Sequence, residues 1–343
     1  MESAIDAHLT CPRTRTRRVG DDFQPPYPAF SARAPQTMAQ VVIGYFGVQL
    51  RGGGGVIETA FEAVNVLFDL PDGPDHLDTV RYIDGAGYET AIAVAYWGDT
   101  KQFSRWIDNP HNQAWWNSDE RVRDGVGYFR EILSPRDEQY ETAYSSAKHL
   151  EGVGVVMGGV SGEILEHGYW GSMRDRIPLS QTDTMSPTGG LSVRDDGNGR
   201  VTVHGHKNLA VIRSGQDWTD TQGEERRVYL EDIEPTLRAG MDFLRDQGAE
   251  VGCYSNRYVQ HIDPDGRAVD KTFGISHWHS LADLERWAES HPTHLKIFGI
   301  FLKKVPELPN LCLYHEVSVF DAAAQRYEYI NCHPGTGLLR PGT

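Results

Sequence analysis

The feature that most constrains the fold of this chain is a segment that recurs half a chain length later. Residues 82–106 read YIDGAGYETAIAVAYWGDTKQFSRW, and residues 261–287 read HIDPDGRAVDKTFGISHWHSLADLERW. An Ile-Asp pair, a Trp and a closing Arg-Trp pair recur in the same order. Such self-similarity at a fixed offset indicates one supersecondary unit that is used twice. With 343 residues, each half is long enough to bury a core of its own.

The hydrophobic pattern predicts the same order of elements in both halves. Alternating and β-branched runs predict strands, and apolar residues at helical spacing predict helices. The first half has strands at 40–50, 76–83, 90–97, 125–133 and 138–144 and helices at 56–69 and 100–116. The second half has strands at 209–214, 251–261, 271–278, 311–321 and 326–331 and helices at 224–247 and 281–304. This is the split βαβ order of ferredoxin-like units, so we expect an α+β fold.

We divide the chain into four parts on this basis. Residues 1–37, rich in Pro and Arg, are expected to form an arm that lies over the core or over a dimer partner. Residues 38–149 form the first ferredoxin-like unit and residues 207–343 the second. Residues 150–206 between them are an insertion, and long insertions in compact domains are often functional.

Charge and cysteine usage exclude several classes of protein. The formal net charge of −15 argues against a broad nucleic-acid surface, which needs clustered cations. No apolar run reaches 18 residues, so we expect no transmembrane helix. The four cysteines form no CxxC pair, which excludes the usual zinc framework and the CxxCH signal for haem attachment. We expect reduced thiols and a cytoplasmic protein.

The second copy of the repeat carries HPTHLKIF where the first reads NPHNQAWW. His291 and His294 share a helix face and could ligate a metal, but no carboxylate or third histidine stands in register to complete a zinc or iron site. An axial haem ligand needs only one imidazole in an apolar pocket. Pro292 breaks the helix before His294, and apolar residues follow it. The alternative is a surface or capping histidine.

Two strands carry polar residues that could do chemistry. In LYHEVSVF, strict alternation puts His315 on one face with Leu313 and Val317, so it is either a structural hydrogen bonder or an acid/base. In NLAVIRSGQDW, Ser214 comes where the predicted strand meets a loop, so it either projects into a pocket or forms a turn before Gly215. The chain has no GxSxG elbow around this serine.

The insertion contains arginines beside aromatic residues, in GYWGSMRDRIPLSQ. Arg174 and Arg176 at a pocket edge would suit a carboxylate, and haem propionates are carboxylates. Surface arginines near Asp175 are an equally good interpretation of this segment.

Together these segments resemble the aldoxime dehydratases, haem-b enzymes that turn aldoximes into nitriles. The similar stretches are EHGYWGSMRDR, RSGQDW, VGCYSNR, LERWAESHPTH, LYHEVSVF and YINCHPGTG, which span most of the chain. The resemblance implies that His294 is the proximal ligand of a non-covalent haem and that His315 is the distal general acid/base.

The same resemblance implies three further roles. Ser214 would hydrogen-bond the oxime hydroxyl. Arg176 is a better candidate than Arg174 for the distal arginine, and we also assign it to cofactor binding. Glu141, in QYETAY, would support the distal polar network.

We therefore expect duplicated ferredoxin-like units that form a barrel-like core of the dimeric α+β barrel type. It would hold haem b, ferrous in the active state, in a homodimer that binds an aldoxime and neither nucleic acid nor membrane. The first alternative is a peroxidase or chlorite-dismutase-like enzyme on the same fold, but such an enzyme uses an Arg-centred distal pocket, and Ser214 and His315 disfavour it. A non-enzymatic haem-binding protein is the second alternative, and haem-free metal hydrolysis is a weaker third.

Overall fold

One antiparallel sheet organises the chain, whose computed structural model describes residues 1–52 and 55–340. Within these residues the sheet has 12 strands in the order β6-β13-β10-β12-β11-β3-β4-β2-β5-β14-β9-β8. Their bounds are β2 (Val42–Arg51), β3 (His76–Ile83), β4 (Tyr88–Trp97), β5 (Gly127–Leu133), β6 (Tyr140–Tyr144), β8 (Ser192–Asp195), β9 (Arg200–His204), β10 (Leu209–Asp217), β11 (Cys253–Ile262), β12 (Ala268–Trp278), β13 (Cys312–Phe320) and β14 (Gln325–Ile330).

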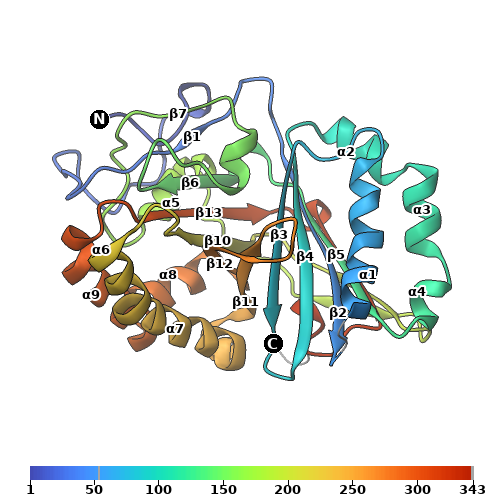
Figure 1. Cartoon of the computed structure of the whole chain (residues 1–343). Helices are drawn as coiled ribbons and strands as arrows, with labels where there is room; N and C mark the ends of the chain where they lie inside the picture. Colours follow the sequence, from blue (N-terminus) through green and yellow to red (C-terminus); the bar gives the residue numbers. More distant parts are fainter. Residues whose placement is uncertain (53–54, 341–343) are drawn as a thin grey trace.

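Helices cover the outside of this sheet (Figure 1). Their bounds are α1 (Gly55–Asn65), α2 (Thr100–Ile107), α3 (Pro110–Asn117), α4 (Glu120–Arg123), α5 (Ser172–Arg176), α6 (Gly223–Arg227), α7 (Glu234–Gln247), α8 (Leu281–Ser290) and α9 (Pro292–Lys304). The prediction of one helix at 100–116 is wrong, because Asn109 caps a new helix that starts with Pro110. The predicted break near Pro292 is confirmed, since α8 ends at Ser290 and α9 begins at Pro292.

The two halves repeat one strand order. In the first half the neighbours run β3-β4-β2-β5, and in the second half they run β11-β12-β10-β13. The halves join edge to edge where β11 pairs with β3, through Gln260 with Arg81 and His261 with Val80. In the described part of the chain the sheet ends at β6 and β8, so it is a curled half-barrel and not a closed barrel.

Two strands cross the predicted unit boundaries. β6 comes from residues 38–149 but pairs with β13 of the second half. β14 comes from residues 207–343 but pairs with β5 of the first half. Each half therefore completes its sheet with a strand from the other half, which a linear division of the sequence does not anticipate.

The N-terminal arm packs on the insertion between the halves. The short strand β1 (Ala32–Arg33) pairs with β7 (Gly159–Val160), and Ala4 N donates to Glu166 at 2.8 Å. Cys11 N donates to the side chain of Gln181 at 3.0 Å. Among the residues with assigned structure, no helix is long and apolar enough to cross a membrane, and all four cysteines are free thiols.

Side-chain alternation gives the sheet two kinds of core. On the inner face, apolar residues from both halves form one cluster, which includes Tyr45, Val94, Val211 and Ile275. On the outer face, each half has a cluster under its own helices. The first-half cluster contains Phe46, Trp97 and Trp106, and the second-half cluster contains Ala210, Trp278, Trp287 and Val317.

Close packing of β2 on β5 generates a stability prediction. A Cβ atom added at Gly47 would lie about 2.1 Å from the ring of Phe129, which is fully buried. Gly47→Ala should therefore lower the free energy of unfolding by about 1–3 kcal/mol in urea denaturation. The control is Gly159→Ala, where a Cβ would meet nothing within 4 Å. Equal stability of the two variants would contradict this packing.

Candidate active site

The pairing of β10 with β13 brings two of the predicted site residues together. Ser214 and His315 are direct cross-strand partners. Their faces follow from alternation, because Ala210 on β10 and Val317 on β13 belong to the cluster under α8. Ser214 lies inside β10, which continues to Asp217, so the interpretation of Ser214 as a turn residue is wrong. Both side chains are only partly buried, which leaves room for contact with another molecule.

A buried ion pair holds the imidazole of His315. Arg176 Nε and Nη2 donate to the two carboxylate oxygens of Glu141 at 2.6 and 3.0 Å, and both side chains are at least 98% buried. Arg176 Nη2 lies 2.6 Å from His315 Nε2, and Glu141 Oε1 lies 3.1 Å from the same nitrogen. A neutral imidazole accepts at Nε2 from the arginine, whereas a protonated one donates at Nε2 to the glutamate. The ion pair therefore offers His315 a partner in both protonation states.

Opposing effects act on the carboxylate of Glu141. Burial favours its neutral form, but the charge of Arg176 and then that of His315 outweigh burial, so the pKa of Glu141 lies below its ordinary value. Glu141 is consequently an anion at neutral pH.

The two arginines of the MRDR segment have different partners. Arg176 contacts Glu141 and His315, as described above. Arg174 instead pairs with Glu285 of α8, at 2.6 Å, and donates to the carbonyl oxygen of Thr184 at 2.8 Å. The structure thus brings Arg176, and not Arg174, to His315.

The two histidines of HPTH also differ. His291 caps α9 by accepting from Thr293 N, and its Nδ1 lies 2.8 Å from Thr293 Oγ1. His294 Nδ1 donates to the carbonyl oxygen of Ala288 at 2.7 Å, which leaves Nε2 as the nitrogen with a free lone pair. Burial lowers the pKa of His294, although the hydrogen bond to Ala288 opposes it, so the ring is neutral and suited to ligation.

The surroundings of His294 fit a large apolar group such as haem. Trp287 and Trp170 lie 4.7 and 5.9 Å from its ring, measured between ring centroids. α9 is rich in apolar residues, yet none of its residues is buried, and Leu295 and Leu302 are 42% and 45% exposed. Trp287 belongs to the same cluster as Val317 of β13. His294 and the Ser214–His315 pair therefore lie on one side of the sheet.

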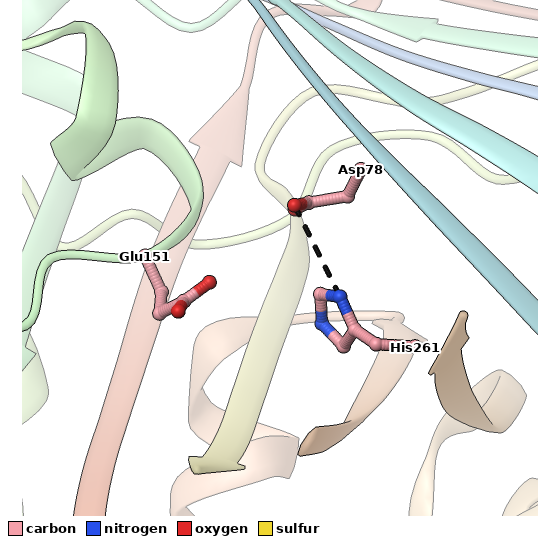
Figure 2. A group of neighbouring side chains, drawn as sticks. All are labelled: Asp78, Glu151 and His261. Atoms are coloured by element: carbon pink, nitrogen blue, oxygen red, sulfur yellow. Dashed lines mark ion pairs between the residues drawn. The ribbon is translucent and has the colours of Figure 1, made fainter. Parts of the chain in front are cut away.

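A separate group of Asp78, Glu151 and His261 has the composition of a metal site (Figure 2). Their potential ligand atoms lie within 4.8 Å of one another. Two cations already neutralise the carboxylates, since Arg213 donates to Asp78 at 2.8 Å and Lys271 to Glu151 at 2.5 Å. Burial and the charge of Arg213 lower the pKa of His261 to about 4. We interpret the group as a buried ion-pair cluster.

Sequence reasoning missed the two tryptophans around His294 and the carbonyl that orients it. Trp170 stands in the same GYWG segment as the predicted arginines, and Trp287 is the closing Trp of the repeat. Trp287 is close to His294 in sequence and gave a visible signal, whereas Trp170 is far from His294 in sequence and gave none. Only the tertiary structure places them against one imidazole.

Comparison with known proteins defines the class of enzyme. The profile of the haem-containing dehydratases matches residues 44–338, so the chain belongs to the haem-containing dehydratase family. It is 56% identical to an aliphatic aldoxime dehydratase of Rhodococcus globerulus, over 99% of this chain and 98% of that protein. It is 33% identical to the phenylacetaldoxime dehydratase of Bacillus sp. (strain OxB-1), over 94% of each chain.

A solved structure agrees with this assignment. The crystal structure of an aldoxime dehydratase in complex with butyraldoxime superposes with a TM-score of 0.97. It is 55% identical in sequence, and the match covers 100% of this chain and 97% of that chain.

The buried pair of Glu141 and Arg176 generates a prediction about pH. Glu141→Gln leaves a buried guanidinium without its counter-charge, which should cost about 3–5 kcal/mol of stability at pH 7. Because the folded pKa of Glu141 is depressed, its contribution is present above about pH 4.5 and is lost as the pH falls through the folded pKa. Unfolding in guanidinium chloride at pH 7 and pH 4 should show that the difference in free energy of unfolding between wild type and Glu141→Gln is smaller at pH 4.

The matched control is Glu138→Gln, which removes a half-exposed carboxylate paired with Arg136. This change should alter stability by less than about 1 kcal/mol at either pH. A Glu141→Gln effect that is the same at both pH values would contradict the ion-pair interpretation.

Proposed function

We propose that His294 would ligate the iron of haem b and that Ser214, His315, Arg176 and Glu141 act on the aldoxime substrate. As a member of its family, the chain is a haem-dependent lyase that converts aldoximes to nitriles. The observation that carries the residue assignment is the direct pairing of Ser214 with His315 on the sheet face that also faces α8 and α9.

An aliphatic aldoxime is the proposed substrate class. Sequence identity is 56% to the aliphatic aldoxime dehydratase and 33% to the phenylacetaldoxime dehydratase. Butyraldoxime, which is bound in the similar crystal structure, is a suitable first substrate for assays.

His315 is proposed to move both protons of the reaction. When bound and reduced, haem would supply an iron able to coordinate the oxime nitrogen and to donate electron density into the N–O bond. His315 gives a proton to the hydroxyl oxygen, so that the group leaves as water, and then accepts the C–H proton. One imidazole serves both steps because it is a donor and then an acceptor near neutral pH. Arg176 can donate to the neutral imidazole of His315, and Glu141 can accept from the protonated one.

Ser214 is proposed to orient the leaving oxygen. Its hydroxyl lies one strand away from His315, on the same face, so both side chains reach one substrate atom. In a site that excludes bulk water, such a hydrogen bond is stronger than in solution.

Three broader expectations remain proposals. The repeated strand order supports two ferredoxin-like units, with the limits 38–149 and 207–343 modified by the exchanged strands. The free cysteines support a cytoplasmic location. A homodimer is the proposed assembly.

The function is tested by nitrile formation from butyraldoxime under anaerobic conditions. We expect turnover with dithionite-reduced enzyme and little turnover with ferric enzyme, because electron donation into the N–O bond requires reduced iron. Phenylacetaldoxime should be the poorer substrate. Equal or faster turnover by ferric enzyme would favour the peroxidase alternative.

The proximal ligand is tested by His294→Ala. Loss of the imidazole should reduce the haem-to-protein ratio and change the Soret band, because no second imidazole of HPTH points to the same place. His291→Ala removes the cap of α9 and should cost about 1 kcal/mol of stability while haem is retained. Full haem occupancy in His294→Ala would show that His294 is not the haem ligand.

The two strand residues are tested by His315→Ala and Ser214→Ala. Both variants should bind haem and aldoxime, because neither side chain holds the cofactor. His315→Ala should accumulate bound substrate without releasing nitrile, and Ser214→Ala should lose roughly 10²-fold in kcat. Absorption spectra during turnover and product analysis provide the measurement. Near wild-type kcat in either variant would remove that residue from the mechanism.

A further inference from the structure

A buried polar network lies directly behind Ser214 and His315. Because side chains alternate along a strand, Arg213 and Glu316 point to the inner face of the sheet. They are cross-strand partners of each other, as Ser214 and His315 are on the outer face. Arg213 is 1% exposed and Glu316 is 5% exposed. The residues proposed to act on substrate are thus backed by a charged pair that substrate does not reach.

The partners of this charged pair come from the other half of the chain. Arg213 Nη2 donates to Asp78 of β3 at 2.8 Å, and Arg213 Nη1 donates to the hydroxyl of Tyr96 on β4 at 2.7 Å. The same Tyr96 hydroxyl donates to Glu316 Oε1 at 2.8 Å. Tyr96 therefore bridges β10 and β13 from the first half, which lacks the HPTH segment.

Further contacts leave the network little freedom. Arg213 Nε donates to the Tyr314 hydroxyl at 3.1 Å. The ring of Tyr314 covers Gly215, where an added Cβ would lie 2.2 Å from a ring atom. Glu316 Oε2 accepts from Val153 N at 2.7 Å. Arg213 uses each of its three nitrogens, and Glu316 uses both oxygens.

The direct junction between the two half-sheets is short. β11 and β3 pair only through Gln260 with Arg81 and His261 with Val80, so few backbone hydrogen bonds form at this junction. The charges of Arg213 and Asp78 are desolvated, and such buried ionic groups can specify one arrangement of the elements that carry them.

We propose that Asp78 and Tyr96 are positioning residues for the dehydration reaction. The backbone ladder sets the register of β10 and β13. Through Arg213 and Glu316, Asp78 and Tyr96 add a side-chain restraint at the row next to Ser214 and His315, and so restrain the distance between the Ser214 hydroxyl and the His315 imidazole. The half of the repeat without the haem histidine thereby acts on the site, although Asp78 and Tyr96 touch no substrate. This inference rests on the proposed roles of Ser214 and His315.

The test is Tyr96→Phe in the haem-loaded enzyme. The variant removes one hydroxyl from the bridge and keeps the ring that packs in the core. We expect kcat for butyraldoxime to fall roughly tenfold to a hundredfold, since displacements of about 1 Å at a reacting centre have effects of that size. KM, haem content and the Soret band should change little, because His294 and the substrate nitrogen are unaffected.

Tyr329→Phe is the matched control. Tyr329 is also a buried tyrosine, and its hydroxyl donates to a buried glutamate, Glu131, at 2.7 Å. Glu131 pairs with Arg257, just as Glu316 neighbours Arg213. This second network lies on β5, β14 and β11 and touches neither β10 nor β13, so kcat should stay near wild type. An equal loss of kcat in both variants would overturn the proposal.

A double-mutant comparison separates positioning from general damage. If Tyr96 acts by placing Ser214 against His315, Tyr96→Phe should cost much less in a Ser214→Ala background than in wild type. The same fold-loss in both backgrounds would overturn the proposal. If Ser214→Ala and His315→Ala keep full turnover, the proposed roles of these two residues fail. If they lose turnover while Tyr96→Phe does not, only this inference fails.

Asp78→Asn provides the second variant if Tyr96→Phe does not fold. It keeps the shape of the side chain and removes the charge that faces Arg213. We expect the same results as for Tyr96→Phe: a lower kcat, an unchanged KM and an effect that is not additive with Ser214→Ala. Wild-type kcat in folded, haem-loaded Asp78→Asn would overturn the proposal.

Discussion

The antiparallel ladder between β10 and β13 is the interaction on which the site depends. One register places Ser214 beside His315 on the outer face and Arg213 beside Glu316 on the inner face. Because the side-chain period of a strand is two residues, a slip of one residue would turn the polar pair inward and the charged pair outward. The apolar neighbours Val211 and Val317, which face opposite cores, oppose such a slip. Packing on both faces therefore fixes the chemistry.

Much of the fold follows from local pattern. The strands, the break at Pro292 and the face that His315 shares with Val317 were predictable because they depend on alternation, on the missing amide hydrogen of proline and on neighbours in sequence. The α+β class and the repeat were visible for the same reason. The single helix predicted at 100–116 is two helices. The prediction followed the apolar spacing and did not use the N-cap residue Asn109 and Pro110, which start a new helix.

What the sequence did not predict depends on residues far apart in the chain. Arg174 and Arg176 are two positions apart and equally charged, and only the location of Glu285 and Glu141 separates their roles. His291 and His294 are distinguished by what their Nδ1 atoms contact. The exchange of β6 and β14 was also hidden, since edge pairing between strands of similar composition leaves no local signal. The sequence pattern left the roles of the candidate site residues undecided, and the resemblance to a known family supplied the predicted roles.

The strand exchange has a consequence for how the protein is made. During synthesis β5 emerges long before β14, the strand that covers its edge. Until β14 has been made, one edge of β5 lacks its strand partner, and an uncovered edge invites pairing with other chains. A duplicated architecture that looks divisible is in this respect a single unit, because its last strand completes the sheet that its first half begins.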